Sequence, residues 1–232
     1  MGPVTPSEGW GVLHLFFEVG PVSDADPEAV VAAVKGAQAD DHQVITFAVL
    51  GHKAQLGVMA LGPDLWRIQR LQADLVAAGL DLVGSYLSLT EVSEYARGMP
   101  PERLEPRLHP QLPPPDAQVV CFYPMSKRRD ATGNWYALDY EERYRLMEGH
   151  GRVGRKYRGQ VVQLVTGSTG LDDWEWGVTL FAQEPGAIKT CVHEMRFDEA
   201  SAVYAEFGPF YIGLIGPPEA ILARVGITDD QS

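Results

Sequence analysis

Two stretches of equal length, 57–75 and 177–195, share a pattern that predicts the fold. The first reads GVMALGPDLWRIQRLQADL, and the second, 120 residues later, reads GVTLFAQEPGAIKTCVHEM. Each begins with Gly-Val in an apolar run typical of a buried strand and continues with apolar residues at helical spacing. These apolar residues are Ile68, Leu71 and Leu75 in the first stretch and Ile188, Cys191 and Met195 in the second. The similarity indicates that one unit occurs twice in the chain.

The elements predicted around the first stretch follow the order β-α-β-β-α-β, which is the ferredoxin-like order. Apolar runs predict strands at 10–19, 44–50, 56–61 and 82–89, and apolar periodicity predicts helices at 26–38 and 64–78. Asp26 is the expected N-cap of the first helix, because Pro27 then takes the first helical position. Residues 1–97 therefore form the first repeat, which we expect to be a scaffold.

The second half repeats this order over residues 117–232. Strands are predicted at 117–123, 160–168, 174–183 and 209–215, and helices at 139–150, 186–196 and 199–206. Asp139 and Glu142 fit a capping box at the start of the first of these helices. Residues 98–116 contain seven prolines and predict an extended linker or loop between the repeats. The sequence thus predicts an α+β fold of two tandem ferredoxin-like repeats.

The amino-acid composition excludes several classes of protein. The 232 residues are 45% hydrophobic and 22% charged, so the chain can bury a core, and the net charge of −12 argues against a nucleic-acid partner. No apolar stretch reaches 18 residues, and the first twenty residues lack a secretory signal pattern. Cys121 and Cys191 lie in predicted elements, where free cysteine is a small hydrophobe. We expect a reduced, cytoplasmic protein without a membrane span.

The acidic average conceals a basic segment. Residues 123–158 contain nine Lys and Arg against five Asp and Glu, so this segment carries +4 and the rest of the chain −16. A basic helix face exposed to water would account for the excess. A binding site for a compact, multiply charged anion would account for it equally well.

The basic segment begins with an abrupt change at the end of the predicted strand AQVVCF. Tyr123 ends the strand, Pro124 is expected to interrupt the ladder, and Lys127, Arg128 and Arg129 follow. This order suggests a strand whose last side chain points into a site, with cations at the rim to hold an anion. We expect Lys127 to pair with a carboxylate of the substrate.

His150 is the histidine with the most distinctive surroundings. It ends the predicted helix that begins at Asp139, and Gly149 and Gly151 flank it, which would let a large flat group approach the backbone. One imidazole is sufficient for haem iron but not for zinc. Capping of the helix C-terminus is the alternative role. The acidic residues of the stretch 170–177, Asp172, Asp173 and Glu175, are expected to face solvent or another subunit.

Four ordered motifs resemble those of the coproheme decarboxylases, which are peroxide-dependent haem synthases of the chlorite dismutase-like superfamily. The motifs are Tyr123-Pro124-Met125-Ser126-Lys127, His150-Gly151, the run 167–181 and the run 195–201. The resemblance is close over the second half and extends to the first half only in element order. The proline-rich insertion and the acidic balance are more similar to the actinobacterial branch.

The resemblance implies a dimeric α+β barrel-like fold, a homopentameric ring and a porphyrin bound in the second repeat. It implies that His150 is the iron ligand and that Tyr123 forms a radical. Gln163 falls at the distal position, where chlorite dismutases carry arginine, and His109 takes the role of the distal base toward peroxide. The other porphyrin-binding residues that it implies are Pro124, Met125, Ser126, Lys127, Trp135, Arg196 and Ser201, with Ser201 holding a propionate.

The implied reaction is the oxidative decarboxylation of two propionates of iron coproporphyrin III (coproheme) by hydrogen peroxide. The product is haem b, formed through a three-propionate intermediate in the last step of coproporphyrin-dependent haem biosynthesis. Coproheme is both substrate and redox cofactor, and its propionates match the local positive charge. Coproporphyrin ferrochelatase is a transient partner on this interpretation. Two alternatives stay open: a chlorite dismutase-like haem enzyme, which Gln163 disfavours, and a non-enzymatic haem-binding or delivery protein.

Overall fold

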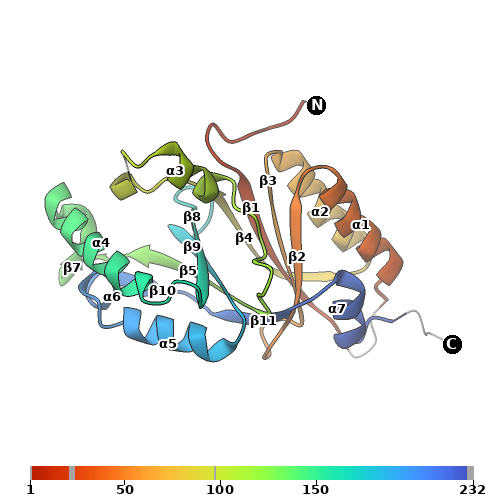
Figure 1. Ribbon diagram of the computed structural model, residues 1–232. Helices are drawn as coiled ribbons and strands as arrows, with labels where there is room; N and C mark the ends of the chain where they lie inside the picture. Colours follow the sequence, from red (N-terminus) through yellow and green to blue (C-terminus); the bar gives the residue numbers. More distant parts are fainter. Residues whose placement is uncertain (1, 21–23, 97, 229–232) are drawn as a thin grey trace.

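The two Gly-Val stretches lie in equivalent strands of two units with the same topology. The computed structural model describes residues 2–20, 24–96 and 98–228 (Figure 1). The strands of the first unit lie in the order β2-β3-β1-β4, and each neighbouring pair is antiparallel. The elements of this unit are β1 (Gly11–Glu18), α1 (Pro27–Ala39), β2 (Gln43–Val49), β3 (Leu56–Gly62), α2 (Leu65–Ala77) and β4 (Asp81–Thr90).

The second unit has the corresponding strand order, β8-β9-β5-β11, again antiparallel throughout. Its elements are β5 (Val119–Lys127), α4 (Tyr140–Arg155), β8 (Val161–Gly167), β9 (Trp176–Ala182), α5 (Pro185–Met195) and β11 (Tyr211–Ile215). The smaller elements are η1 (Glu94–Ala96), α3 (Pro101–Leu108), β6 (Arg129–Asp130), β7 (Gly133–Asn134), η2 (Trp135–Ala137), α6 (Glu199–Ala202), β10 (Ala205–Phe207) and α7 (Pro218–Arg224). The predicted pair of ferredoxin-like repeats is confirmed.

The two four-stranded sheets join at both edges into a closed barrel. Strand β4 pairs with β8 through Leu89 opposite Gly167 and Thr90 opposite Thr166. Strand β11 pairs with β2 from Gly213 opposite Val49 onward. Because β5 also pairs with β9, eight strands form a continuous ring, which agrees with the expected barrel-like fold. Closure removes the unpaired edges that an open sheet would expose.

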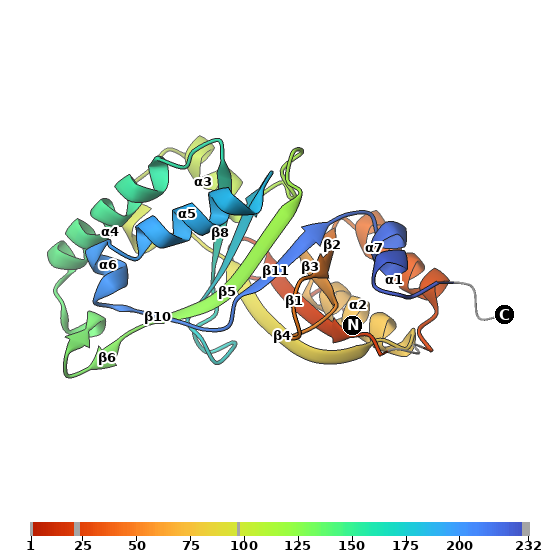
Figure 2. The same ribbon diagram turned by 90° about the horizontal axis from the view of Figure 1, so that it is seen from below.

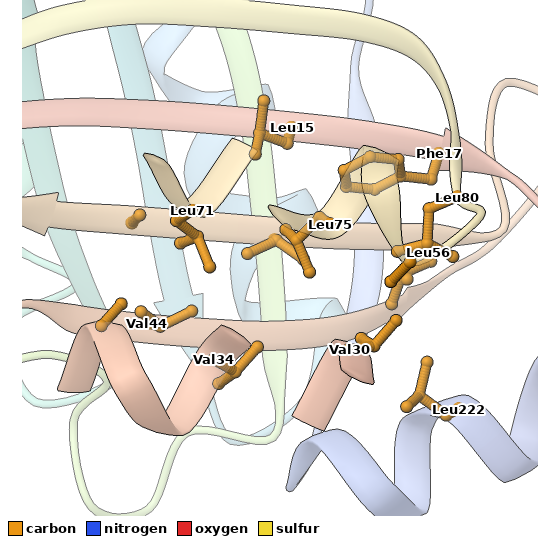
Figure 3. Close-up of a cluster of buried hydrophobic side chains, with 14 of the residues drawn as sticks. Leu15, Phe17, Val30, Val34, Val44, Leu56, Leu71, Leu75, Leu80 and Leu222 are labelled. Carbon is orange, nitrogen blue, oxygen red and sulfur yellow. The ribbon is translucent and has the colours of Figure 1, made fainter. Parts of the chain in front are cut away.

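Helices cover the barrel on two opposite sides, with α1, α2 and α7 on one and α4, α5 and α6 on the other (Figure 2). Leu71 and Leu75 of α2 and Val34 of α1 pack against the outer face of the first sheet (Figure 3). A second cluster fills the barrel, and its largest members include Phe16, Phe47, Met59, Phe122 and Phe181. Both repeats contribute to this interior, so the barrel core is shared.

The linker prediction for residues 98–116 is wrong in part, because the segment contains helix α3. Pro101 lies at the start of this helix, where a missing N–H costs nothing, and the helix ends before His109. Pro106 lies inside the helix. The proline content hid a short helical stretch in which Glu102, Arg103 and Leu104 are good helix formers.

Three further boundaries differ from the sequence predictions. Strand β5 continues through Pro124 to Lys127, and the carbonyl of Pro124 accepts from the Gly208 amide. Helix α4 extends to Arg155, so His150 lies within the helix and does not cap it. The segment 199–206 is helical only in α6, and β10 then pairs with β5. Tyr123, Met125 and Lys127 therefore share one face of a single strand.

The predicted N-caps are confirmed. Asp26 accepts from the Ala29 amide at 3.0 Å, and Asp139 accepts from the Glu142 amide at 2.9 Å. Each carboxylate satisfies a helix amide that has no partner within the helix. In the part of the chain that the structure describes, no helix is both long enough and apolar enough to cross a membrane.

Candidate functional site

Gln163 and Tyr123 lie on the same outer face of the second sheet, on strands β8 and β5. Val165 of β8 lies opposite Val178 of β9, which in turn lies opposite Tyr123 of β5. Gln163 is two residues from Val165, and directly opposed residues of antiparallel strands point to the same side. Gln163, Val165, Val178 and Tyr123 therefore share a surface outside the barrel, on the side that carries α4 and α5 (Figure 1).

This surface is covered unevenly. Val178 and Tyr123 are buried in a cluster that also contains Ile188 of α5. On β8, by contrast, Val165 is 42% exposed and Gln163 is exposed. A strand face that exposes an apolar side chain and an amide, beside a well-packed region, is suited to a flat ligand.

His150 projects from α4 with one ring nitrogen already engaged. Its Nδ1 lies 2.8 Å from Oδ2 of Asp198, whose side chain is only 7% exposed. The hydroxyl of Ser201 lies 3.4 Å from the same nitrogen. Because a carboxylate accepts, Nδ1 donates the proton of this hydrogen bond, and in a neutral imidazole the lone pair is then on Nε2. Among the described residues none makes a hydrogen bond with Nε2, so this atom is suited to bind a metal.

Tyr123 lies in a stack of aromatic rings and is only 8% exposed. Its ring centroid is 4.4 Å from that of Phe210, and the two planes make an angle of 21°. The guanidinium of Arg196 lies 3.7 Å from the ring centroid of Phe207, which is also next to Tyr123. Burial raises the pKa of Tyr123 well above its ordinary value, and Arg196 opposes this rise. The phenol is therefore neutral at pH 7.

Lys127 is buried, which corrects the expectation of a cation at the rim. Only 8% of the residue is exposed, and Nζ donates to the Ala200 carbonyl at 3.0 Å. The ammonium also lies 4.1 Å from the centre of the Trp135 ring, within reach of a cation–π interaction. Burial lowers the pKa of Lys127 to about 8, while Asp198 and then Glu175 act in the opposite direction.

Glu175 holds the end of β5, although it was expected to face solvent or another subunit. Its Oε2 accepts from the Lys127 amide at 2.7 Å, and its own amide donates to Ser126 Oγ at 3.2 Å and to the Met125 carbonyl at 3.1 Å. The residue is only 6% exposed. Asp172 also has a structural contact, since Oδ2 accepts from the Leu87 amide.

The remaining predicted residues lie around these groups or apart from them. Trp135 and Ser201 are buried, next to Lys127 and His150 respectively, and Arg196 is exposed over the Phe207 ring. Pro124 lies in the middle of β5, opposite Gly177.

His109 lies at the end of α3, where its Nδ1 is 2.7 Å from Glu105 Oε1 and its ring centroid is 5.1 Å from that of Trp10. The preceding Leu108 carbonyl accepts from Thr90 Oγ1, and Thr90 lies opposite Thr166 of β8. This places His109 beside the seam between β4 and β8. Its contacts in the described chain do not include Tyr123, His150 or Gln163.

The donor set fits an iron porphyrin. One imidazole held at Nδ1 by a carboxylate can bind the iron, and the exposed face of β8 offers a surface for the flat ring. Asp198 is a candidate site residue that the sequence patterns did not single out. It comes from a separate element, 48 residues after His150, so no local spacing pointed to it.

The fold and the matching family define the class of protein. The family model described as chlorite dismutase matches residues 25–216, and the chain belongs to this family. A chlorite dismutase from Candidatus Nitrospira defluvii, solved with imidazole, has a TM-score of 0.76 at 21% identity, over 95% of this chain and 96% of that one. At this identity the likeness concerns the fold alone.

Relatives with a higher sequence identity are named coproheme decarboxylase. The coproheme decarboxylase of Staphylococcus carnosus is 40% identical over 239 residues, which cover 92% of this chain and 94% of the relative. A coproheme decarboxylase of Thermus thermophilus is also 40% identical and covers 97% of both chains. A solved heme-binding protein from Thermus thermophilus has a TM-score of 0.83 at 40% identity, over 97% of this chain and 99% of that one.

Proposed function

We propose that this protein decarboxylates coproheme with hydrogen peroxide and releases haem b. Each round converts one propionic acid side chain and one peroxide molecule into a vinyl group, carbon dioxide and two molecules of water. Two rounds give haem b through the three-propionate porphyrin. The observation that carries the proposal is the His150 imidazole, held by Asp198 with Nε2 available, in a chain 40% identical to coproheme decarboxylases.

The roles of the residues follow from their surroundings. His150 Nε2 would hold the iron, and the outer face of β8, with Gln163 and Val165, would line the porphyrin pocket. With hydrogen peroxide as the oxidant, Tyr123 would lose an electron and a proton, and the resulting phenoxyl radical would take a hydrogen atom from the propionate β-carbon. Because burial holds the phenol neutral, an electron and a proton must leave it together.

The propionates require cations and hydrogen-bond donors at the porphyrin edge. We assign this function to the segment Pro124–Lys127 together with Trp135, Arg196 and Ser201, and Lys127 would serve it by turning its buried ammonium from the Ala200 carbonyl toward a propionate. Arg196 supports the assignment best, because its guanidinium is exposed and lies only on aromatic rings in the described structure. His109 is proposed as the base that takes a proton from peroxide.

Two further proposals concern the assembly of the protein and its location in the cell. We propose a homopentamer that acts in the cytoplasm and receives coproheme from coproporphyrin ferrochelatase. Light scattering after size-exclusion chromatography measures the assembly directly. A mass of one or two chains would contradict the pentamer and leave the reaction itself untouched.

The decisive experiment adds hydrogen peroxide to the coproheme complex and follows the porphyrin masses. The three-propionate porphyrin should appear first, followed by haem b. A second candidate function, haem binding without catalysis, is favoured by the name of the Thermus heme-binding protein. Stable binding with unchanged porphyrin masses would support that candidate and contradict the decarboxylase. Oxygen release from chlorite, with no change in the porphyrin, would support a chlorite dismutase.

A further inference from the structure

The carboxyl group of Glu91 lies on the outer face of the second sheet, against Gly167 of β8. A methyl group added at Gly167 would lie 2.7 Å from Glu91 Oε1 and closer still to Oε2. Gly167 is opposite Trp176 of β9, which is opposite Met125 of β5. Met125 shares the outer face of β5 with Tyr123, so the Glu91 carboxyl lies on that same face. The missing side chain of Gly167 leaves the space that this carboxyl fills.

Glu91 differs from its neighbour Glu94 in its partners. Arg143 lies 3.5 Å from Glu94, whereas no lysine or arginine of the described chain forms an ion pair with Glu91. The groups that act on the Glu91 carboxyl are the Trp176 indole of β9 and the Glu8 carboxylate, from the segment before β1. Burial raises the pKa of Glu91, a hydrogen bond from Trp176 opposes the rise, and Glu8 adds to it. Burial and a neighbouring like charge thus both favour the protonated carboxyl.

A bound porphyrin would bring further carboxylates to this place. The proposed function puts the propionates at the edge that the segment Pro124–Lys127 lines, and Met125 of this segment is in the same row as Gly167. Two strand spacings, about 10 Å, separate Met125 from Gly167, which is within the span of one porphyrin. Two carboxylates in contact cannot both ionise without a large cost in free energy, and sharing one proton removes that cost.

We propose that Glu91 binds a propionate of coproheme by sharing one proton with it. Solvent supplies this proton when the porphyrin binds, since Glu91 is accessible to water. The proton also meets a demand of the reaction. One ionised propionate, one hydrogen peroxide and one proton give one vinyl group, one carbon dioxide and two water molecules, so each round consumes a proton. The inference rests on the proposed function for the identity of the ligand.

Proton uptake during the binding of iron-free coproporphyrin III tests the proposal without iron or peroxide. The absence of iron in this probe excludes proton changes that accompany iron binding by His150. Titration in weakly buffered solution with a pH indicator counts the protons taken up for each porphyrin. The wild type should take up about one proton more than Glu91→Gln, which keeps the shape of the side chain and cannot ionise. As the pH rises, its affinity should fall up to about tenfold more for each pH unit than that of Glu91→Gln.

Glu18→Gln is the matched control, because it changes an exposed glutamate at the end of β1 and should take up protons as the wild type does. Gly167→Ala is a second test variant, which leaves the Glu91 carboxyl in the protein but displaces it. The added methyl group meets only the end of the flexible Glu91 side chain, so the strand should keep its fold, as circular dichroism will verify. This variant should lose the same proton as Glu91→Gln, and wild-type proton uptake by Gly167→Ala would contradict the proposal.

Infrared difference spectra identify the group that holds the proton, because a protonated carboxyl has a carbonyl band that a carboxylate lacks. Carbon-13 labelling of the protein shifts its own band and leaves the porphyrin bands in place. We expect a protein carboxyl band on binding in the wild type and its absence in Glu91→Gln. Equal proton uptake in these two proteins would overturn the proposal. None of these readouts involves catalysis, so unchanged porphyrin masses after peroxide addition would contradict the decarboxylase and leave the role of Glu91 in binding intact.

Discussion

The phenol of Tyr123 can be tested separately from its ring. Replacement by phenylalanine keeps the stacking on Phe210, whose ring centroid lies 4.4 Å away, and removes only the hydroxyl. We expect Tyr123→Phe to fold and bind coproheme as the wild type does. Its decarboxylation rate should fall at least about a hundredfold, as for loss of a proton-transferring side chain. The porphyrin masses after peroxide addition measure this, and turnover at the wild-type rate would refute the role of the phenol.

A second prediction at the residue scale concerns His14, which is 1% exposed inside the barrel. Its Nε2 lies 3.0 Å from Thr179 Oγ1, and its ring stacks on Phe122. Burial lowers the pKa of His14 to about 3 from an ordinary value of 6.5. The unfolded state therefore binds a proton that the folded state does not. The stabilising effect is complete above about pH 6.5 and is lost as the pH falls toward 3.

We expect the free energy of unfolding to decrease by up to roughly 1.4 kcal/mol for each pH unit from this residue alone. Urea unfolding at several pH values measures the slope. His14→Gln keeps a hydrogen-bond partner for Thr179 and should flatten the slope, whereas His52→Gln, at an exposed position, should not. Equal slopes in wild type and His14→Gln would contradict the assignment.

At the scale of the element, the uncovered face of β8 is the proposed porphyrin surface. Val165→Asp should weaken coproheme binding at least about tenfold, because it puts a charge against the ligand, and should leave the fold intact since Val165 is 42% exposed. Val83→Asp on β4 is the matched control, with an exposure of 49%. Spectrophotometric titration measures both affinities. Equal affinities in the two variants would place the porphyrin elsewhere.

Elements were predictable from the sequence where a local rule decided them. Asp26 and Asp139 begin helices because each carboxylate caps a nearby amide. Pro124 misled the prediction, since the path of β5 is set by its pairing with β9 and not by one missing donor. The contacts of Asp198 and Glu175 could not be predicted from local sequence patterns either. Their partners, His150 and Lys127, come from other elements, and only the folded chain decides that they meet.

At the scale of the whole molecule, the sequence predicted the order of the elements but not the pairings that close the barrel. The order of elements in each repeat was predictable, because it depends on patterns within about a hundred residues. The two seams that close the barrel depend on pairings between repeats. Among the described residues, the backbone pairs between β4 and β8 are Leu89 with Gly167 and Thr90 with Thr166, which no sequence pattern marks.

Because the barrel is closed, the two repeats depend on each other for the burial of its interior. Phe16, Phe47 and Met59 of the first repeat pack inside the barrel with Phe122 and Phe181 of the second. Fragment 1–97 would contain α1 and α2 but lose the part of the outer core that Ile221 and Leu222 of α7 supply, and it would expose this inner face to water. An apolar sheet face of that kind drives association. We therefore expect neither fragment 1–97 nor fragment 98–232 to be a folded monomer.

Size-exclusion chromatography, binding of a hydrophobic dye and urea unfolding of each fragment test this expectation. Each fragment alone should associate, bind the dye and unfold without a cooperative transition. Production of both fragments together should restore a single cooperative transition, because the inner faces then cover each other across both seams. A monomeric fragment 1–97 that unfolds cooperatively and binds no dye would mean that the first repeat is an autonomous domain, and that the barrel is an interface between two folded units.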